Sequence, residues 1–144
     1  MLHIKKVSNQ TELESIIEIR TKVFQQEQGV APELEFDGLD EEATQFLAFW
    51  DSQAVGTTRV RIIDQYTAKI ERLAVLPLFR RKGIGKELMI AALQLISEQN
   101  KSVEVVVHAQ IYIAPLYQAL GFTVIGEQFR EANINHEKMT KQIF

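Results

Sequence analysis

The sequence contains no cysteine, and this absence excludes several kinds of chemistry at once. Disulfides, thiolate metal ligands, redox CxxC pairs and covalent cysteine intermediates all require a residue that the chain does not have. We therefore expect no metal site and no covalent carrier. A chain without cysteine also fits a reducing compartment, and we expect the protein to be cytoplasmic.

Long apolar runs are missing as well. No stretch approaches the roughly 18 residues that a membrane-spanning helix requires, so we expect no membrane partner. The first ten residues, MLHIKKVSNQ, show no apolar core followed by a cleavage site, which argues against secretion. The formal net charge of −3 argues against nucleic acid as a partner, because nucleic-acid binding usually requires a basic face.

The residues that are present are sufficient for one ordinary domain. The 144 residues are 46% hydrophobic and 24% charged, which is typical of a globular protein with a substantial core. We predict a single domain over residues 1–144.

The spacing of apolar residues predicts a mixed α/β domain with the element order β-α-β-β-β-α-β-α-β-β. The predicted strands span residues 2–7, 44–50, 54–64, 67–76, 103–109, 122–127 and 137–143, and the predicted helices span 11–28, 84–98 and 111–120. The β-α-β unit at 67–109 should be parallel, whereas the rest of the sheet should be largely antiparallel. We expect a twisted sheet flanked by helices.

Local signals predict how the first helix begins. Ser8 and Asn9 are cap residues, and Thr11-x-x-Glu14 has the form of a capping box. The residues that then recur at helical spacing and predict the apolar face of this helix are Leu13, Ile16, Ile17, Val23 and Phe24.

Other signals concern later elements. Asp51-Ser52-Gln53 predicts a hairpin turn, and the second long helix should end near Asn100. We expect the C-terminal strand EKMTKQI (137–143) to be exposed, which makes a homodimer compatible with the sequence without requiring one.

The stretch LAVLPLFRRKGIGKELM (73–89) places four cations and two glycines where a strand passes into an apolar helix. A helix N-terminus leaves about four N–H groups without intrahelical partners and carries partial positive charge, so it favours anions. Glycine there allows the backbone to approach an anion closely. The pattern indicates a site for a diphosphate or larger phosphate group, and the alternative is a solvated basic turn.

Two nucleotide-binding patterns do not fit this stretch. A Walker loop requires Gly-x4-Gly-Lys-Ser/Thr, and that spacing is absent. A dinucleotide fingerprint requires a third glycine at position 88, which is Leu88, and no acidic residue closes the next strand.

The stretch instead resembles motif A of the GCN5-related N-acetyltransferases, the GNAT superfamily, whose pattern is Arg/Gln-x-x-Gly-x-Gly/Ala. The predicted element order resembles that fold along the whole chain. The resemblance implies acetyl-CoA as the cosubstrate. It assigns the pyrophosphate to a loop made of Arg80, Arg81, Lys82, Gly83, Ile84, Gly85 and Lys86, and the pantetheine arm to Leu73, Ala74 and Val75.

A second stretch strengthens the resemblance. APLYQALGF (114–122) is similar to motif B, which implies that Tyr117 lies near the CoA sulfur. Gln110 stands where the family often has an asparagine that contacts CoA.

Two other stretches narrow the resemblance to the small bacterial ElaA/YjcF-like acetyltransferases. The segments that resemble theirs are VFQQEQGVAPELEFDGLD (23–40) and GFTVIGEQFREANINHEKM (121–139).

Several residues are candidates for the proton transfers of acetylation. Tyr117 is our candidate general acid for the CoA thiolate, with a packed tyrosine as the alternative. Glu71 lies two residues before Leu73 and is a candidate base, unless it only pairs with its neighbour Arg72. Glu27 is a second candidate base, and His108 and His136 are also conceivable, although a lone histidine on a strand is more often structural than catalytic.

The acceptor site is less defined by the sequence. Arg59 and Arg61 share one strand face and are candidates for binding an acceptor carboxylate, although arginines in such positions are often solvated or paired. Six carboxylates in the loop 32–42 could attract a cationic amine or could simply be solvated.

These patterns predict an acetyl-CoA-dependent N-acetyltransferase that transfers an acetyl group directly to a primary amine of a small molecule or peptide. The alternative is an acyl-CoA-binding sensor or interaction module with weak or no turnover. Nucleic-acid binding through residues 80–86 is disfavoured by the net charge and by the absence of interleaved aromatic residues.

Overall fold

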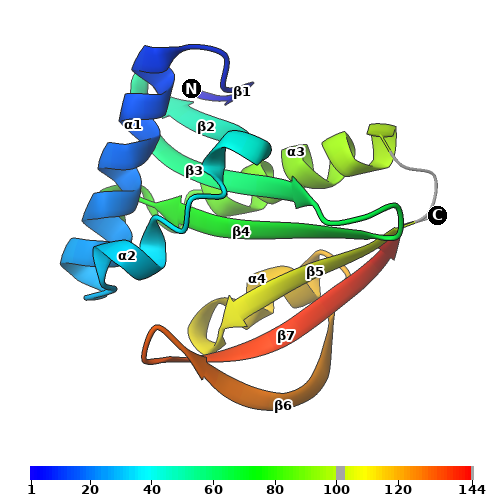
Figure 1. The fold of residues 1–144 in the computed structure, drawn as a ribbon. Coiled ribbons are helices and arrows are strands. Elements are labelled where there is room, and N and C mark those ends of the chain that lie inside the picture. Colours follow the sequence, from blue (N-terminus) through cyan, green and yellow to red (C-terminus); the bar gives the residue numbers. More distant parts are fainter. Residues whose placement is uncertain (100–102, 144) are drawn as a thin grey trace.

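A seven-stranded sheet organises the protein, and its strands follow the spatial order β1-β2-β3-β4-β5-β7-β6 (Figure 1). This computed structural model describes residues 1–99 and 103–143. The strands are β1 (Leu2–Lys6), β2 (Thr44–Trp50), β3 (Gln53–Ile62), β4 (Thr67–Val75), β5 (Val103–Gln110), β6 (Thr123–Glu131) and β7 (Ile134–Ile143). All paired neighbours are antiparallel except β4 and β5, which are parallel as predicted.

Helices cover both faces of this sheet. They are α1 (Gln10–Arg20), which continues as a π-helix (Thr21–Glu27), α2 (Pro32–Glu35), α3 (Ile84–Gln99) and α4 (Ala114–Ala119), with 3-10 turns at Asp40–Glu42, Pro77–Phe79 and Ile111–Ile113. The α1 side and the α3/α4 side lie on opposite faces (Figure 1). The predicted mixed α/β fold and its element order are therefore confirmed, with one additional short helix. The expected end of α3 near Asn100 lies outside the described residues.

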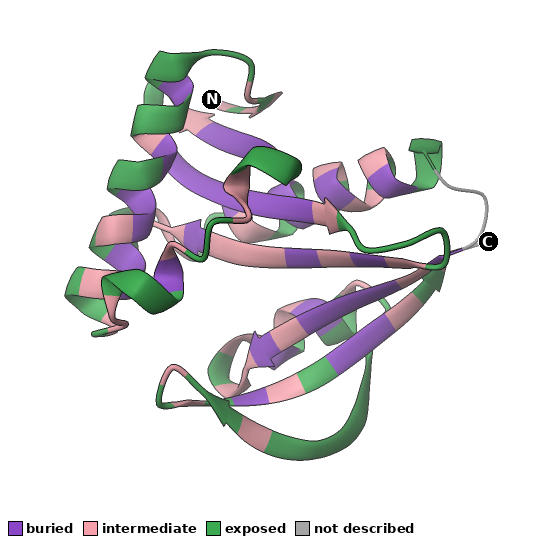
Figure 2. Cartoon of the chain, viewed as in Figure 1, coloured by how far each residue is buried: buried purple, intermediate pink, exposed green. Residues whose placement is uncertain are grey.

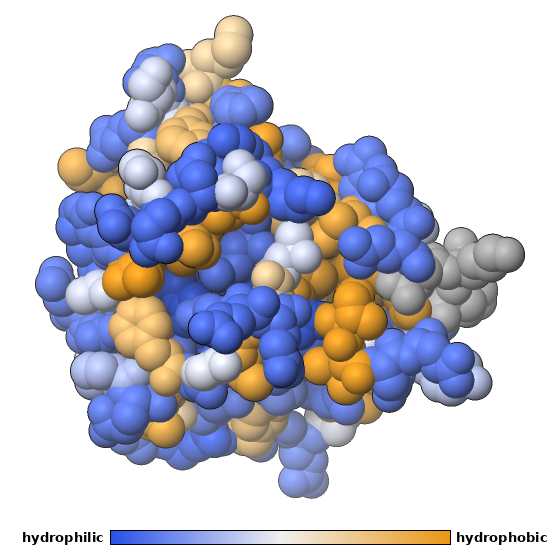
Figure 3. All heavy atoms as spheres, turned by 45° about the horizontal axis from the view of Figure 1, so that its top comes forward, coloured by the Kyte–Doolittle hydropathy of each residue, from blue (hydrophilic) through white to orange (hydrophobic). Residues whose placement is uncertain are grey.

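Each face of the sheet has its own apolar cluster. On the larger one, Ile84, Leu88 and Ile96 of α3 pack against the sheet. On the other, Ile16 and Ile19 of α1 pack with residues such as Leu47 and Ala74 from the sheet. Buried side chains accordingly concentrate in the central strands (Figure 2). Outside, hydrophilic residues dominate the face shown in Figure 3, with apolar residues in small patches between them.

The start of α1 confirms one of its two predicted signals. Asn9, one of the predicted cap residues, is the N-cap, and its side chain accepts a hydrogen bond from the Glu12 amide at 2.9 Å. Glu12 in turn accepts one from the Ser8 amide at 2.9 Å, so Glu12, and not Glu14 of the predicted box, makes the reciprocal capping contact.

The predicted apolar face of this helix is confirmed in part. Ile16, Val23 and Phe24 are buried. Leu13 and Ile17 are exposed, whereas Ile19 and Arg20 are buried. Arg20 is turned inward because its guanidinium forms ion pairs with Glu35 and Asp40, which lie in the segment between the helix and β2. An apolar-periodicity argument cannot identify a charged residue on the buried face.

The feature that creates the site is the parting of β4 and β5. Only three residue pairs join them, from Thr67 opposite Glu104 to Lys69 opposite Val106. Strand β4 continues to Val75 and β5 to Gln110 without pairing to each other, and Figure 1 shows them diverging. One edge of β4 therefore carries backbone N–H and C=O groups with no strand partner.

A β-bulge lies on the diverging part of β4. The register with β3 shifts between Thr57 and Arg59, so that two residues of β4 oppose one residue of β3. Arg72 within the bulge has a φ of 56°, and the Thr58 hydroxyl donates to the Glu71 carbonyl at 3.2 Å. A bulge bends a strand and changes the direction of its side chains, and here it does so beside the gap.

The C-terminal hairpin corrects another expectation. Strand β7 lies between β5 and β6 and is internal, so the edge of the sheet is β6 and not EKMTKQI. The argument for a homodimer through that strand is therefore wrong. Two of the hairpin turns, Asp51–Ser52 within the predicted turn and Ala132–Asn133, have two consecutive residues with positive φ, the conformation that suits tight hairpins.

Candidate active site

A cavity of about 330 Å³ lies where β4 and β5 part. It is closed on one side by the end of the π-helix and by α2, and on another by the turn between β6 and β7. The predicted site residues on its wall are Arg61, Glu71, Leu73, Gln110 and Tyr117, and both His108 and His136 also line it.

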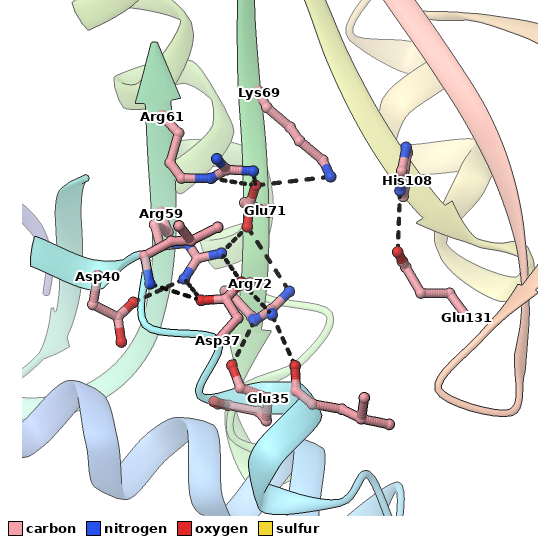
Figure 4. A network of polar contacts seen from close by, with 12 residues as sticks. Glu35, Asp37, Asp40, Arg59, Arg61, Lys69, Glu71, Arg72, His108 and Glu131 are labelled. Carbon is pink, nitrogen blue, oxygen red and sulfur yellow. Dashed lines mark hydrogen bonds and ion pairs between the residues drawn. The ribbon is translucent and has the colours of Figure 1, made fainter. Parts of the chain in front are cut away.

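Glu71 lies at the centre of a charged network on this wall (Figure 4). Its carboxylate contacts Arg59 closely and accepts from the Arg61 Nε at 2.9 Å. Lys69 and Arg72 are each 3.9 Å away. Four cations stabilise its anionic form, and its oxygens already accept hydrogen bonds, so this environment argues against a role as proton acceptor.

The acidic segment 32–42 folds over the same network. Asp37 makes a two-pronged ion pair with Arg59, with both contacts at 2.9 Å. These hydrogen bonds hold the pKa of Asp37 far below its usual value. Asp40 accepts from Arg20 at 2.7 Å and from Arg59 at 3.0 Å. These carboxylates are thus neutralised by buried arginines, and they are not a free acidic patch for a cationic amine.

The two arginines predicted to contact the acceptor have different positions. Arg59 is fully buried and does not line the cavity; its guanidinium is engaged by carboxylates, and its Nε has no hydrogen-bond partner in the part of the chain that the structure describes. Arg61 lines the cavity with a side chain that is 20% exposed. Of the pair, only Arg61 is placed to meet a small molecule in the cavity.

Tyr117 extends from α4 into the wall and is 6% exposed. Its ring packs edge-on against Phe122, with 5.8 Å between centroids. Burial strongly raises the pKa of its phenol, so the hydroxyl stays protonated throughout the neutral range. The predicted α4, with Pro115 in its first turn, positions this side chain.

The cationic turn before α3 lies at the end of β4, outside the cavity wall. Arg80 forms a double ion pair with Glu27 at 2.6 Å per contact, and its Nε donates to the Val75 carbonyl at 2.9 Å. Lys82 lies over the Trp50 ring, 5.4 Å from its centroid. Arg81 and Lys86 are exposed.

Glu27, a candidate base, is the carboxylate that pairs with Arg80. This pairing lowers the pKa of the Glu27 carboxyl, and Glu27 does not line the cavity. This position argues against Glu27 as the base.

The glycines of the turn leave room where a ligand would need it. Gly83 has a φ of 80°, and a Cβ there would meet nothing within 4 Å. A Cβ on Gly85 would lie 3.6 Å from Leu116 and 4.0 Å from Leu73 and Val75. Gly85 therefore lies beside side chains of both β4 and α4. These positions fit a phosphate at the turn and a narrow chain along β4.

Gln110 is engaged with Gln28 across the cavity. The Gln110 amide donates to the Gln28 oxygen at 2.9 Å, and the reverse bond is 3.3 Å long. This pair connects the end of the π-helix to the end of β5.

Two residues that the sequence analysis did not single out belong to the site. Lys69 lines the cavity, and burial lowers the pKa of its ammonium group. Glu131 in β6 also lines it and contacts His108 (Figure 4). Lys69 could have been found, because it lies two residues before Glu71 and shares its strand face. Glu131 could not, because its strand was predicted to end at residue 127.

Within residues 1–99 and 103–143, no group of three or more His, Asp or Glu side chains could hold a metal ion. In the same part of the chain, no helix is long and apolar enough to cross a membrane.

Comparison with known proteins places this geometry in a family. Residues 7–143 match the acetyltransferase (GNAT) domain. The uncharacterized protein YyaT of Bacillus subtilis is 34% identical over 145 residues, which cover 99% of this chain and 97% of that protein. Escherichia coli ElaA has the same fold, with a TM-score of 0.83 and 23% identity over 98% of this chain and 99% of that one. PaiA N-acetyltransferase of Thermoplasma acidophilum, solved in complex with coenzyme A, gives a TM-score of 0.72 and 22% identity over 99% of both chains.

Proposed function

Because the chain belongs to the GNAT acetyltransferase family, we propose that it is an acetyl-CoA-dependent N-acetyltransferase acting on a primary amine of a small molecule or peptide. One observation carries the proposal. The parting of β4 and β5 leaves an unpaired strand edge beside a cavity, and β4 leads from there to the glycine-containing turn before α3, so we infer a groove along β4 for the donor.

The donor half of the groove is formed by the turn and by β4. The first-turn N–H groups of α3 have no intrahelical partners and carry partial positive charge, so they suit a pyrophosphate. Arg81 and Lys86 are exposed beside them and add positive charge. Leu73 to Val75 would lie along the pantetheine arm, where Gly85 leaves space.

When bound, acetyl-CoA supplies an acetyl group activated as a thioester. Backbone N–H groups on the unpaired edge of β4 can donate hydrogen bonds to the thioester oxygen, since β5 does not use them. The bulge at Arg72 alters the direction of the strand at this point.

Tyr117 would act at the leaving sulfur. Its raised pKa makes complete proton transfer to a thiolate, whose conjugate acid has a pKa of about 8.5, uphill. The protonated phenol can nevertheless donate a hydrogen bond that stabilises the departing thiolate, and this is the role we assign to it.

The acceptor would enter the cavity from the side of α2 and the β6–β7 turn. Arg61 and Lys69 line this part and could hold an anionic group of the acceptor. Their distances from Glu71, 2.9 Å and 3.9 Å, show that Arg61 is more firmly engaged than Lys69.

A catalytically weak acyl-CoA-binding module is the second candidate function. It is favoured by one observation, namely that the two carboxylates predicted as bases, Glu71 and Glu27, are both held by arginines.

Thermal melting with acetyl-CoA, followed by detection of free thiol with a panel of amines, tests both candidates. Ligand at 100 times its Kd should stabilise the fold by about 2.7 kcal/mol and raise Tm by several degrees. No shift at millimolar acetyl-CoA would contradict both. A shift without thiol release for any amine would favour the binding module.

A further inference from the structure

We propose that His108 is the general base that accepts the proton of the attacking amine, and that Glu131 positions and supports it. This inference rests on the proposed acetyltransferase function and supplies the proton acceptor that Glu71 and Glu27 do not provide.

The position of His108 carries the first part of the argument. Lys69 and Val106 form the last parallel pair of β4 and β5. Glu71 and His108 are each two residues beyond that pair, so they stand on opposite sides of the gap at the same depth, and both line the cavity. Figure 4 shows them facing the space between the strands.

The partners of the two side chains differ in kind. Glu71 is surrounded by cations, which favour its unprotonated form. His108 has a carboxylate partner instead: its Nδ1 lies 3.3 Å from the Glu131 Oε1. A carboxylate beside an imidazole stabilises the imidazolium that forms when the ring accepts a proton. The hydrogen bond to His108 lowers the pKa of Glu131, which keeps that carboxylate charged.

The same contact fixes the tautomer of His108. With Nδ1–H donating to Glu131, Nε2 keeps its lone pair and can accept a proton. Nε2 has no hydrogen-bond partner in residues 1–99 and 103–143. Phe129 packs edge-on against the ring at 5.1 Å and limits its rotation.

The neighbouring His136 is less suited to this role. Its Nδ1 lies 2.7 Å from the Ile134 carbonyl, and its Nε2 lies 3.8 Å from the second oxygen of Glu131. Its side chain is 8% exposed and is stacked on Phe129. Both ring nitrogens therefore face protein groups.

The proposed reaction balances as a direct transfer. A neutral primary amine forms a C–N bond with the acetyl carbon as the C–S bond to CoA breaks. One amine proton passes to His108 Nε2 and is then released, and the CoA thiolate takes up one proton. The products are an acetamide and free CoA thiol.

The test compares His108→Gln with the wild-type protein, using acetyl-CoA binding, thiol release with an amine panel and slow acetyl-CoA hydrolysis, in which water is the acceptor. A general base typically contributes about 10²–10⁴-fold, and we expect a loss of that size in the rate with unchanged acetyl-CoA affinity. His3→Gln, at an exposed histidine in β1, is the matched control and should keep the wild-type rate. His136→Gln should lose markedly less than His108→Gln.

The pH profile separates a base from a structural residue. Besides Glu131, the titratable groups around His108 are Lys69 and Glu71 from β4 and His136 and Lys138 from β7. We expect an acidic limb in kcat/KM that disappears in His108→Gln. Glu131→Gln should lower kcat while the KM for acetyl-CoA stays unchanged, because the imidazolium that forms loses an adjacent negative charge; a merely structural role for Glu131 would change KM as well.

The outcomes are distinct. His108→Gln retaining the rate within about threefold, or His136→Gln losing as much, would overturn the assignment while leaving the proposed function intact. Wild-type protein that binds acetyl-CoA but shows neither transfer nor hydrolysis would overturn the enzymatic function and the base together. If His108→Gln fails to fold, an unchanged kcat in Glu131→Gln overturns the His108–Glu131 pair.

Discussion

At the scale of single residues, the partners of a side chain decide whether it is available for chemistry. Glu71 and His108 occupy matching places on the two strands, yet Glu71 is held by arginines, and one ring nitrogen of His108 has no partner among residues 1–99 and 103–143. Residue type and strand position were accessible from the sequence. Their partners were not, because Arg59, Arg61 and Glu131 come from other segments of the chain.

Tyr117→Phe tests the hydrogen bond to the leaving sulfur. Removing the hydroxyl should lower kcat by about 100-fold, because the thiolate loses a donor, while the ring still packs on Phe122. Steady-state kinetics and an acetyl-CoA titration check this, with Kd expected to stay constant. Full kcat in the variant would eliminate Tyr117 from the mechanism.

Asp37 should make the stability of the fold sensitive to acid. Its pKa is depressed in the folded protein, so it stabilises the fold above its unfolded value of about 3.9, and this contribution is lost as the pH falls below that value. Urea unfolding should show Asp37→Asn to be less stable by about 1–3 kcal/mol at pH 6, with a smaller difference from wild type at pH 3.

Glu41→Gln is the control for Asp37, since Glu41 is exposed in the same segment. An equal gap between wild type and Asp37→Asn at both pH values would contradict the assigned ion pairing.

At the scale of elements, apolar periodicity predicted the strands and α3 well, because their buried residues are apolar. Of the apolar residues that recur along α3, Ile84, Leu88, Ala92 and Ile96 are buried, and Ala91 and Leu95 are half-buried. Periodicity failed in part for α1, where Arg20 is on the buried face, and it shortened the C-terminal hairpin, where β6 is largely exposed. Neither element buries a regular row of apolar side chains: α1 buries charged residues as well, and β6 buries almost none.

Arg20 connects α1 to the segment that covers the cavity, through both oxygens of the buried Glu35 carboxylate at 2.7 and 2.9 Å. Arg20→Met should destabilise the protein by about 3–5 kcal/mol, because it leaves Glu35 buried without its partner. Chemical denaturation measures this loss. The double variant Arg20→Met/Glu35→Leu should recover most of it; a double variant no more stable than Arg20→Met would show that the loss has another cause.

Gly85→Val should weaken acetyl-CoA binding by at least about tenfold, because the added carbons would enter the gap between Leu73, Val75 and Leu116. Stability should not fall, since valine has a higher helix propensity than glycine. Calorimetric titration and thermal melting separate the two effects. Gln94→Val, at an exposed position of the same helix, should leave the affinity unchanged; equal weakening in both variants would contradict the groove along β4.

At the scale of the whole molecule, the sheet consists of two halves joined by the short parallel pairing of β4 and β5 and by contacts such as Gln28 with Gln110. The sequence predicted that β4 and β5 are parallel. It could not predict where they part, because that depends on the bulge at Arg72 and on what fills the gap.

Acetyl-CoA should therefore slow hydrogen exchange along the unpaired edge of β4, from Ile70 to Val75, by contributing hydrogen bonds that β5 does not provide. Exchange measured by mass spectrometry with and without ligand checks this. Peptides from β1 and the first residues of β2 should be unaffected, and protection confined to them would contradict the placement of the ligand.

The edge strand β6 has a consequence for how copies of this protein meet. Its register with β7 shifts between Ile125 and Phe129, and Gly126 within the shift has a φ of 78°. Figure 1 shows the strand bowed at this point. A continuous exposed edge would offer a template on which a second chain could add a strand and begin an aggregate. Here the irregularity divides the edge into short pieces, which protects a concentrated solution of the protein from edge-to-edge association.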